Sequence, residues 1–355
     1  MPYPRRPALA GLVVLALAAC TAAEPSAAGP PTGPTDGPTA SPTTSAPAPS
    51  PTADGAPAVD DAMAALEEEY EARIGVAALD TGTGERVEHR ADERWGYAST
   101  IKVFVAAELL RTTTAEQRAE RVTWSAQEVE VAGYSPVTGE HLDDGLTLDE
   151  LAEAAVRESD NAATNLLFER IGGPDGLRAA FELLDDTTTE PVRTEPDLNT
   201  VEPGSTDDTT TPAAFTADLD TILHGGWLAP EDADLLLGWM TGNATGDSLV
   251  RAGAPEGWTV ADKSGGAGAL RHDVAVVTPP GRDPVVVTIL TERDDPDAGT
   301  DDELVARTAA AVLDRLSQRS GRHGSSRVSA TGAGCRWSCR STRRVPQSTQ
   351  RTYRT

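Results

Sequence analysis

The sequence is poor in lysine, cysteine and aromatic residues. Phe, Trp and Tyr make up 4% of its 355 residues, and only Lys102 and Lys263 are Lys among the 30 basic residues. The three cysteines, at positions 20, 335 and 339, lie outside the part that reads as globular, so neither a disulfide framework nor a Cys-ligated zinc site organises the core. The fold must therefore depend on packing.

Positive charge and metal-binding spacings are also scarce. The formal net charge of −26 excludes binding to nucleic acid or to an anionic membrane surface as the main activity, and an anionic substrate would need local positive charge. The five His residues show neither H-x-H nor H-x-x-x-H spacing, and there is no G-x-x-x-x-G-K-[ST] phosphate loop. We therefore predict an activity that uses no metal and no cofactor.

The chain divides by composition into a leader, a linker, a globular part and a tail. Residues 1–20 combine two Arg, an apolar stretch and Leu-Ala-Ala-Cys, which resembles a bacterial lipoprotein signal with Cys20 as the lipidated residue. An ordinary secretory signal is the alternative. Residues 21–58, rich in Ala, Pro, Thr, Ser and Gly, predict a disordered linker, and residues 319–355, with nine Arg and no Asp or Glu, a disordered tail. We expect an exported protein, lipid-anchored at the outer face of the cytoplasmic membrane or otherwise secreted.

Residues 59–318 read as one catalytic domain of the α+β class. Alternating apolar patterns predict strands at both of its ends, at 73–80, 85–90, 269–278 and 284–291. Helical spacing predicts helices at 59–72, 102–110, 147–157, 160–171, 173–184, 212–223, 230–241 and 301–316. This order predicts an antiparallel sheet built from both chain ends (59–98 and 242–318), flanked by helices, with an inserted all-helical domain (99–241).

Ser99-Thr-Ile-Lys102 stands at the start of an apolar helix. Three residues apart on a helix, the hydroxyl and the amine would share one face, and a desolvated lysine can take the proton of a serine nucleophile. The alternative is a serine cap followed by a surface lysine. Because the chain keeps only two lysines, and lysine unlike arginine can change protonation state, the catalytic interpretation is favoured.

Two further motifs carry polar groups that suit a cleft. Ser159-Asp160-Asn161 precedes a helix, so capping is the simple interpretation, whereas Ser159 and Asn161 facing a cleft would move a proton and hold an amide. Lys263-Ser264-Gly265 begins at the last residue of a strand predicted at 258–263, where Lys263 would meet a carboxylate.

Taken in this order, the three motifs resemble those of the penicillin-recognising serine enzymes. The stretch from Arg193 to Asn199, Arg-Thr-Glu-Pro-Asp-Leu-Asn, looks like the omega-loop signature of class A β-lactamases, with Asp197 where Glu is commoner. The resemblance covers nearly all of residues 59–316.

The resemblance implies a role for each matching residue. Ser99 would be the acylated nucleophile, Lys102 and Glu195 its basic partners, and Ser159 the proton relay to the lactam nitrogen. Which of Lys102 and Glu195 takes the Ser99 proton stays open. The backbone N–H groups of Ser99 and Ala267 would form the oxyanion hole. Asn199 and Glu195 would hold the hydrolytic water, and an ion pair between Arg193 and Asp208 would close the omega loop. The residues that would bind substrate are Tyr134, Asn161, Lys263, Ser264, Gly265 and an arginine. That arginine would be Arg251 or Arg271, with Arg251 favoured.

The sequence therefore predicts a class A serine β-lactamase acting on small β-lactam molecules as a monomer. A D,D-peptidase is the first alternative, although Glu195 with Asn199 argues for a dedicated deacylating carboxylate. The second is a non-catalytic β-lactam sensor that stays acylated at Ser99, which would need a signalling segment across the membrane; we expect none after residue 20.

Overall fold

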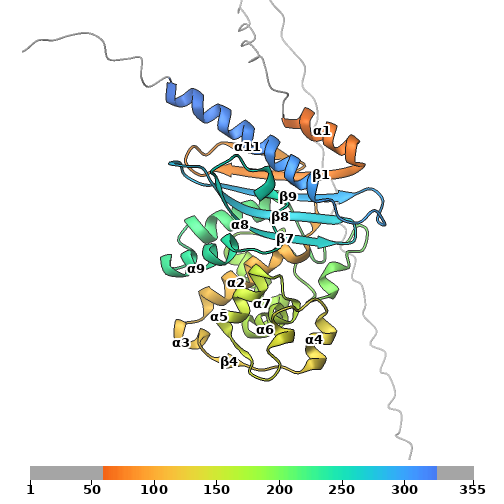
Figure 1. The fold of residues 1–355 in the computed structure, drawn as a ribbon, viewed down its shortest axis with the longest axis vertical. Helices are drawn as coiled ribbons and strands as arrows, with labels where there is room; N and C mark the ends of the chain where they lie inside the picture. The colour runs from red at the N-terminus through yellow and green to blue at the C-terminus, as the bar shows by residue number, and fades with distance from the viewer. Residues whose placement is uncertain (1–58, 326–355) are drawn as a thin grey trace, which may run out of the picture. The chain divides into compact units, whose positions relative to one another are not determined.

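The computed structural model describes residues 59–325, and Figure 1 shows a sheet with helices on both faces. The five-stranded antiparallel sheet has the order β2-β1-β9-β8-β7. β1 (Ala72–Asp80) and β2 (Arg86–His89) come from the N-terminal side, and β7 (Thr259–Ala267), β8 (Leu270–Thr278) and β9 (Val285–Arg293) come from the C-terminal side. The two sides join along β1 and β9, paired from Ala72 opposite Arg293 to Asp80 opposite Val285. The predicted α+β class, with a sheet built from both ends, is confirmed.

Two helices cover one face of the sheet. α1 (Val59–Tyr70) and α11 (Asp302–Ser325) pack against each other and against β1 and β9, burying Met63, Leu313 and Leu316. α11 is longer than predicted and continues seven residues into the segment expected to be a disordered tail. Extending a helix that is already anchored avoids the cost of nucleation, which explains why the helix passes the end predicted at residue 316.

The other face of the sheet meets the helical part of the chain. α2 (Lys102–Thr112) is buried along most of its length, and the ring of Phe104 packs at a tilt against those of Phe181 and Phe215, with ring centroids 5.4 and 4.4 Å apart. The surrounding helices are α5 (Leu148–Arg157), α6 (Asn161–Ile171), α7 (Gly173–Leu183), α8 (Pro212–His224) and α9 (Pro230–Thr241). The predicted helices of this part are therefore present with boundaries within two residues.

Several short helices and strands were not predicted from the sequence. α3 (Ala115–Arg118) and α4 (Ala126–Ala132) each begin with a complete capping box, Thr114 with Gln117 and Ser125 with Glu128, a signal that the sequence does carry. The other missed elements are η1 (Ala98–Ile101), η2 (Thr138–Glu140), η3 (Asp197–Asn199), α10 (Val250–Gly253) and the strand pairs β3 (Trp95–Gly96) with β6 (Thr209–Thr210) and β4 (Arg121–Val122) with β5 (Leu146–Thr147). Within residues 59–325, no helix is both long and apolar enough to cross a membrane.

Candidate active site

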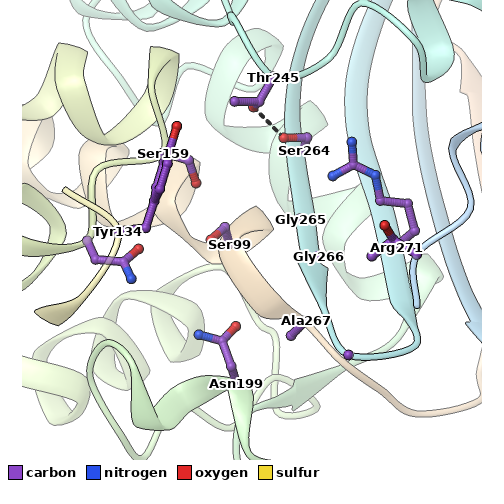
Figure 2. Close-up of a pocket in the computed structure, with 13 residues that line it drawn as sticks. Ser99, Tyr134, Ser159, Asn199, Thr245, Ser264, Gly265, Gly266, Ala267 and Arg271 are labelled. Atoms are coloured by element: carbon purple, nitrogen blue, oxygen red, sulfur yellow. Dashed lines mark hydrogen bonds between the residues drawn. The ribbon is translucent and has the colours of Figure 1, made fainter. Parts of the chain in front are cut away.

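A cleft of about 360 Å³ opens between the free edge of β7 and the helical part (Figure 2). It is lined by Ser99, Tyr134, Ser159, Asn161, Asn199, Thr245, Ser264, Gly265, Gly266, Ala267, Gly268, Arg271 and Thr300. Segments far apart in the sequence thus bring most of the predicted site residues together.

Ser99 and Lys102 lie at the junction of η1 and α2. Lys102 is fully buried, and its Nζ donates to the carbonyl of Ser159 at 2.8 Å and to Oδ1 of Asn161 at 2.5 Å. Nζ also lies 2.9 Å from Oε1 of Glu195. Burial lowers the pKa of Lys102, and the Glu195 carboxylate opposes this shift. Among the described residues, the hydrogen-bonding partners of Nζ do not include the Ser99 hydroxyl, so the direct contact predicted from the helical spacing is not formed.

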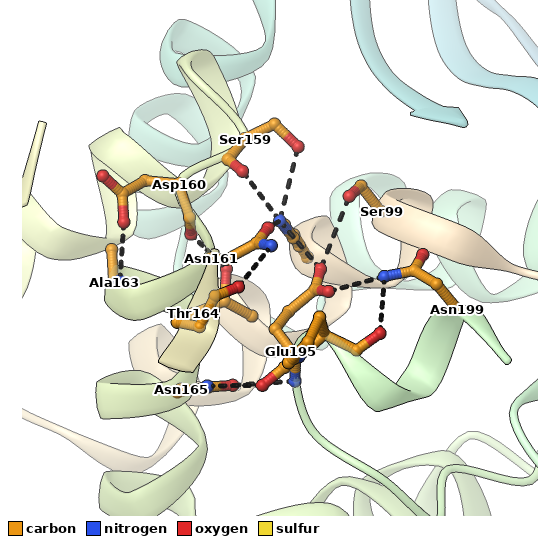
Figure 3. A network of polar contacts seen from close by, with 12 residues as sticks. Ser99, Ser159, Asp160, Asn161, Ala163, Thr164, Asn165, Glu195 and Asn199 are labelled. Carbon is orange, nitrogen blue, oxygen red and sulfur yellow. Dashed lines mark hydrogen bonds and ion pairs between the residues drawn. The ribbon is translucent and has the colours of Figure 1, made fainter. Parts of the chain in front are cut away.

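Glu195 occupies the position between the nucleophile and the amide of Asn199 (Figure 3). Its Oε1 is 3.5 Å from the Ser99 hydroxyl, and its Oε2 accepts a 2.7 Å hydrogen bond from Nδ2 of Asn199. The Glu195 side chain is buried, so two fixed donors and the serine surround a carboxylate that has little access to bulk water. The Glu195 carboxylate can therefore accept a proton on the side of Ser99 or on the side of Asn199.

Asn165, which the sequence analysis missed, fixes the backbone of Glu195. Its Nδ2 donates to the carbonyl of Glu195 at 2.8 Å, and its Oδ1 accepts from the N–H of Glu195 at 2.9 Å. Asn165 lies four residues after Asn161 on α6, a spacing that puts both amides on one helix face. This four-residue spacing was the feature of the sequence that could have identified Asn165 as a site residue.

The omega loop is closed by the expected ion pair. Nε of Arg193 lies 2.5 Å from Oδ2 of the buried Asp208. Asp208 also accepts a 2.6 Å hydrogen bond from the hydroxyl of Tyr97, and the N–H groups of Val192 and Arg193 complete its coordination. The loop that carries Glu195 is therefore tied to the base of the cleft.

The Ser159-Asp160-Asn161 motif both caps a helix and places polar groups at the cleft. The Asp160 side chain caps α6 by accepting from the N–H of Ala163 at 2.8 Å, and it also holds Thr138. Ser159 has a left-handed backbone with φ of 57°, and its hydroxyl lies 3.4 Å from Nζ of Lys102 and 3.2 Å from Nζ of Lys263. The hydroxyl of Ser159 thus joins the two lysines of the chain.

Lys263 is the second fully buried amine of the site. Its Nζ also donates to the carbonyl of Ser264 at 2.8 Å. Burial, and secondly the charge of Lys102, lower the pKa of Lys263 to about 7, although the carboxylates of Asp273 and Asp262 oppose the shift. The whole motif lies within β7, since that strand continues beyond the predicted end at Lys263 to Ala267.

Gly265 allows β7 to approach the nucleophile. A Cβ at this position would lie 3.0 Å from the side chain of Thr100 and 3.3 Å from the backbone nitrogen of Ser99. Any larger residue would push the strand away from η1. The glycine therefore sets the width of the cleft beside Ser99.

The register of β7 corrects the oxyanion prediction. Ala267 pairs with Leu270 across a two-residue turn, and the N–H of Arg293 in β9 donates to the carbonyl of Ala269 at 3.1 Å. Leu270, the next residue, therefore turns its polar groups toward Ala267. Because alternate residues of an edge strand direct N–H outward, Gly266 presents its N–H at the free edge beside the cleft. The prediction of Ala267 was wrong by one residue.

The structure also corrects the preference between the two arginines. The guanidinium of Arg251 lies 2.5 Å from the buried Asp262 and 2.5 Å from Asp247, and Arg251 does not line the cleft. Arg271 does line it, with Nε paired to Asp302 at 2.5 Å. Carboxylate partners engage Arg251 from two sides, so Arg271 is the arginine available to an anionic substrate.

Asn161 and Tyr134 lie on the helical side of the cleft. Asn161 uses Oδ1 to accept from Lys102, and its Nδ2 donates to the carbonyl of Ala132 at 2.9 Å. Tyr134 is 59% exposed and lines the entrance. Cys20, the predicted lipidation site, lies outside the described residues. Within residues 59–325, no group of three or more His, Cys, Asp or Glu side chains is placed to hold a metal ion.

Two buried titratable groups lie outside the cleft. His272 donates from Nε2 to the carbonyl of Gly96 at 2.8 Å and accepts at Nδ1 from the N–H of Thr291 at 3.1 Å, so these partners select the neutral ring. Burial lowers the pKa of His272 to about 4. Burial and, secondly, the neighbouring Asp186 raise the pKa of Asp218 to about 9.

An α+β fold with a serine at a helix start, a buried Lys–Glu pair and a lysine on an edge strand defines a penicillin-recognising serine enzyme. The model of the β-lactamase enzyme family matches residues 58–316. The chain belongs to this family, as a class A member. A β-lactamase of Bacillus licheniformis is 44% identical over 257 residues, covering 72% of this chain and 83% of that protein, and one of Amycolatopsis lactamdurans is 43% identical over 272 residues, covering 76% and 89%. The crystal structure of a class A β-lactamase from Clostridium kluyveri superposes with a TM-score of 0.71 at 40% identity, covering 73% of this chain and 98% of that one.

Proposed function

We propose that this chain hydrolyses the amide bond of β-lactams through an acyl-enzyme on Ser99 and a water activated by Glu195, giving resistance to β-lactam antibiotics. The observation that carries this mechanism is the position of the buried Glu195 carboxylate, with Oε1 3.5 Å from the Ser99 hydroxyl and Oε2 2.7 Å from Asn199. One carboxylate thus adjoins both the nucleophile and a site for water.

In the acylation step, the Ser99 oxygen attacks the lactam carbonyl while its proton passes to a base. Glu195 is the basic group that contacts Ser99, and Lys102 adjoins the same carboxylate oxygen at 2.9 Å. Ser159, which lies next to both lysines, then delivers its proton to the departing lactam nitrogen. Ser159 regains a proton from Glu195 through Lys102, whose Nζ contacts both groups, so Glu195 is unprotonated again before the next step. The N–H groups of Ser99 and Gly266 stabilise the negative oxygen of the tetrahedral intermediate.

In the deacylation step, a water held between Glu195 and Asn199 attacks the ester on Ser99. Glu195 takes a proton from that water as a general base, and the serine oxygen leaves with a proton. The substrate carboxylate meanwhile binds to Lys263, Ser264 and Arg271 on the β7 side of the cleft, which supplies the local positive charge that an acidic protein otherwise lacks.

The test is to replace Glu195 with Ala and follow benzylpenicillin turnover together with the intact mass of the protein. Loss of a general base typically costs about 10²- to 10⁴-fold in rate. The variant should accumulate a covalent adduct with the mass of the protein plus the whole lactam. The matched control is Asp197→Ala, an exposed carboxylate two residues away, which should turn over like the wild type. Wild-type turnover in Glu195→Ala would remove the basis of the mechanism, and a wild-type adduct that lasts for hours would favour the peptidase or sensor alternatives.

We further propose that the mature protein is a monomer held at the outer face of the cytoplasmic membrane by a lipid on Cys20. The support is the Leu-Ala-Ala-Cys sequence and the Pro-rich linker that follows it. Membrane partition of the wild type should exceed that of Cys20→Ser, and equal release of both into the medium would contradict the anchor. Light scattering of the released protein reports whether it is a monomer.

A further inference from the structure

A chain of polar groups runs from the protein interior to the hydroxyl of Ser264. The loop after α9 supplies Asn243 and Thr245, and Asp262 of β7 supplies the buried end. Asn243 donates from Nδ2 to Oδ2 of Asp262 at 2.7 Å, and its Oδ1 accepts from both the N–H of Thr245 at 3.0 Å and the Thr245 hydroxyl at 2.8 Å. The Thr245 hydroxyl in turn lies 2.6 Å from that of Ser264 (Figure 2).

The orientation of the Asn243 amide follows from its neighbours. The Thr245 backbone N–H can only donate, so it must face the amide oxygen. The carboxylate of Asp262, which Arg251 engages through its other oxygen at 2.5 Å, faces the amide nitrogen. Gly246 leaves room for this contact, because a Cβ at that position would lie 1.7 Å from Oδ2 of Asp262. The interior end of the chain is therefore fixed.

The positions of two hydroxyl protons, those of Thr245 and Ser264, follow from the three oxygen atoms in contact, which are Oδ1 of Asn243 and the two hydroxyl oxygens. In the structure, the Thr245 hydroxyl donates to Asn243, so the hydroxyl of Ser264 must donate to Thr245 across the 2.6 Å contact. In that state the proton of Ser264 points away from the substrate. A carboxylate beside Ser264 needs a donor, so Ser264 must turn its proton outward.

We propose that Thr245 is a positioning residue for substrate recognition, whose hydroxyl turns from Asn243 to Ser264 when the substrate carboxylate binds. Asn243 keeps the backbone N–H of Thr245 as a donor in this second state, so its oxygen is not left without a partner. The bound arrangement is then Thr245 donating to Ser264 and Ser264 donating to the carboxylate, in which each hydrogen bond polarises the next. This inference rests on the proposed function, since it takes Ser264 as a ligand of the carboxylate.

The test uses Thr245→Val, which keeps the shape of the side chain and removes the hydroxyl, with Thr245→Ser as the conservative control. We expect kcat/KM for benzylpenicillin to fall about tenfold in Thr245→Val, the upper end of what one hydrogen bond between neutral groups contributes, with kcat at saturation nearly unchanged. Thr245→Ser should restore the wild-type value. Melting temperatures of the variants check that the fold is kept.

A double-mutant cycle with Ser264→Ala separates positioning from a general structural effect. If Thr245 acts through Ser264, Thr245→Val has no further effect once Ser264 is Ala. An undiminished loss in that background, a wild-type kcat/KM in Thr245→Val, or a failure of Thr245→Ser to rescue it would each overturn the inference. Failure of the proposed function would appear differently, as a wild-type protein that does not turn over benzylpenicillin at all.

Discussion

The charge of Lys263 should limit activity at alkaline pH. Its pKa lies near 7 because the amine is fully buried and adjoins Lys102, whereas the pKa of an ordinary lysine is 10.5. In the folded free enzyme, Lys263 is charged below about pH 7 and loses its charge as the pH rises. Only the charged amine can pair with the substrate carboxylate, so binding weakens on the alkaline side.

The magnitude follows from the charged fraction. Each pH unit above the pKa reduces the charged form of the free enzyme about tenfold, so kcat/KM for benzylpenicillin should be roughly 100-fold lower at about pH 9 than at its plateau. A loss of this size is within the roughly 2–5 kcal/mol that removal of one partner from a buried charge pair costs. In the substrate complex the carboxylate restores the charge of Lys263, so kcat should hardly change over the same range.

The assay is the pH profile of kcat and kcat/KM between about pH 6 and about pH 10 for the wild type and Lys263→Arg, with melting curves as a check on folding. The guanidinium stays charged throughout, so the alkaline decline should disappear in the variant. Lys102 cannot produce the decline as a base, because rising pH favours its unprotonated form. A kcat/KM that is constant to about pH 9, or an identical decline in a folded Lys263→Arg, would refute the reasoning.

Three further predictions concern buried ionisable groups. Stability should fall as pH decreases from about 6.5 to about 4, by on the order of 3 kcal/mol from His272 alone, because burial disfavours the charged imidazolium in the folded state; urea unfolding of His272→Gln should show a shallower acid decline. Asp218 binds its proton more tightly in the folded state, which costs stability as pH rises from about 4 to about 9. Asp218→Asn is neutral at every pH and removes the cost of taking up that proton, so it should melt higher than the wild type at pH 8 and equally at pH 4; the opposite order would contradict the raised pKa. Lys102→Arg keeps the charge but removes any practical capacity to act as a neutral base, so acylation measured by stopped flow should slow by about 10² or more, and near-normal acylation would show that only the charge matters.

The chemistry of the site could be predicted from the sequence because it is carried by short local spacings. Ser99 with Lys102, Ser159 with Asn161, and Lys263 with Ser264 each lie within one turn or one strand end, where neighbours in sequence stay neighbours in space. The strands at the two chain ends were also predictable, because alternating apolar residues mark them independently of the rest of the fold.

Other features depended on partners that are distant in sequence. Lys102 and Ser99 lie three residues apart, but Glu195, brought in from 93 residues beyond Lys102, takes the amine as an ion-pair partner. Arg251 looked available in the sequence and is instead occupied by Asp262 and Asp247. Competition among side chains for charged partners is decided only when the segments are packed together.

The remaining differences come from strand register and helix anchoring. Whether Gly266 or Ala267 presents its N–H to the cleft depends on how β7 pairs with β8, since a shift of one residue reverses which groups point outward. The sequence by itself determined the candidate nucleophile, the two lysines of the site and the sheet that supports them, because local pattern and residue chemistry specify these. Only the tertiary structure decided that Arg271, the N–H of Gly266 and the hydroxyl of Ser264 face the cleft. The reason is that hydrogen bonds and ion pairs between distant segments fix the direction of each of these polar groups.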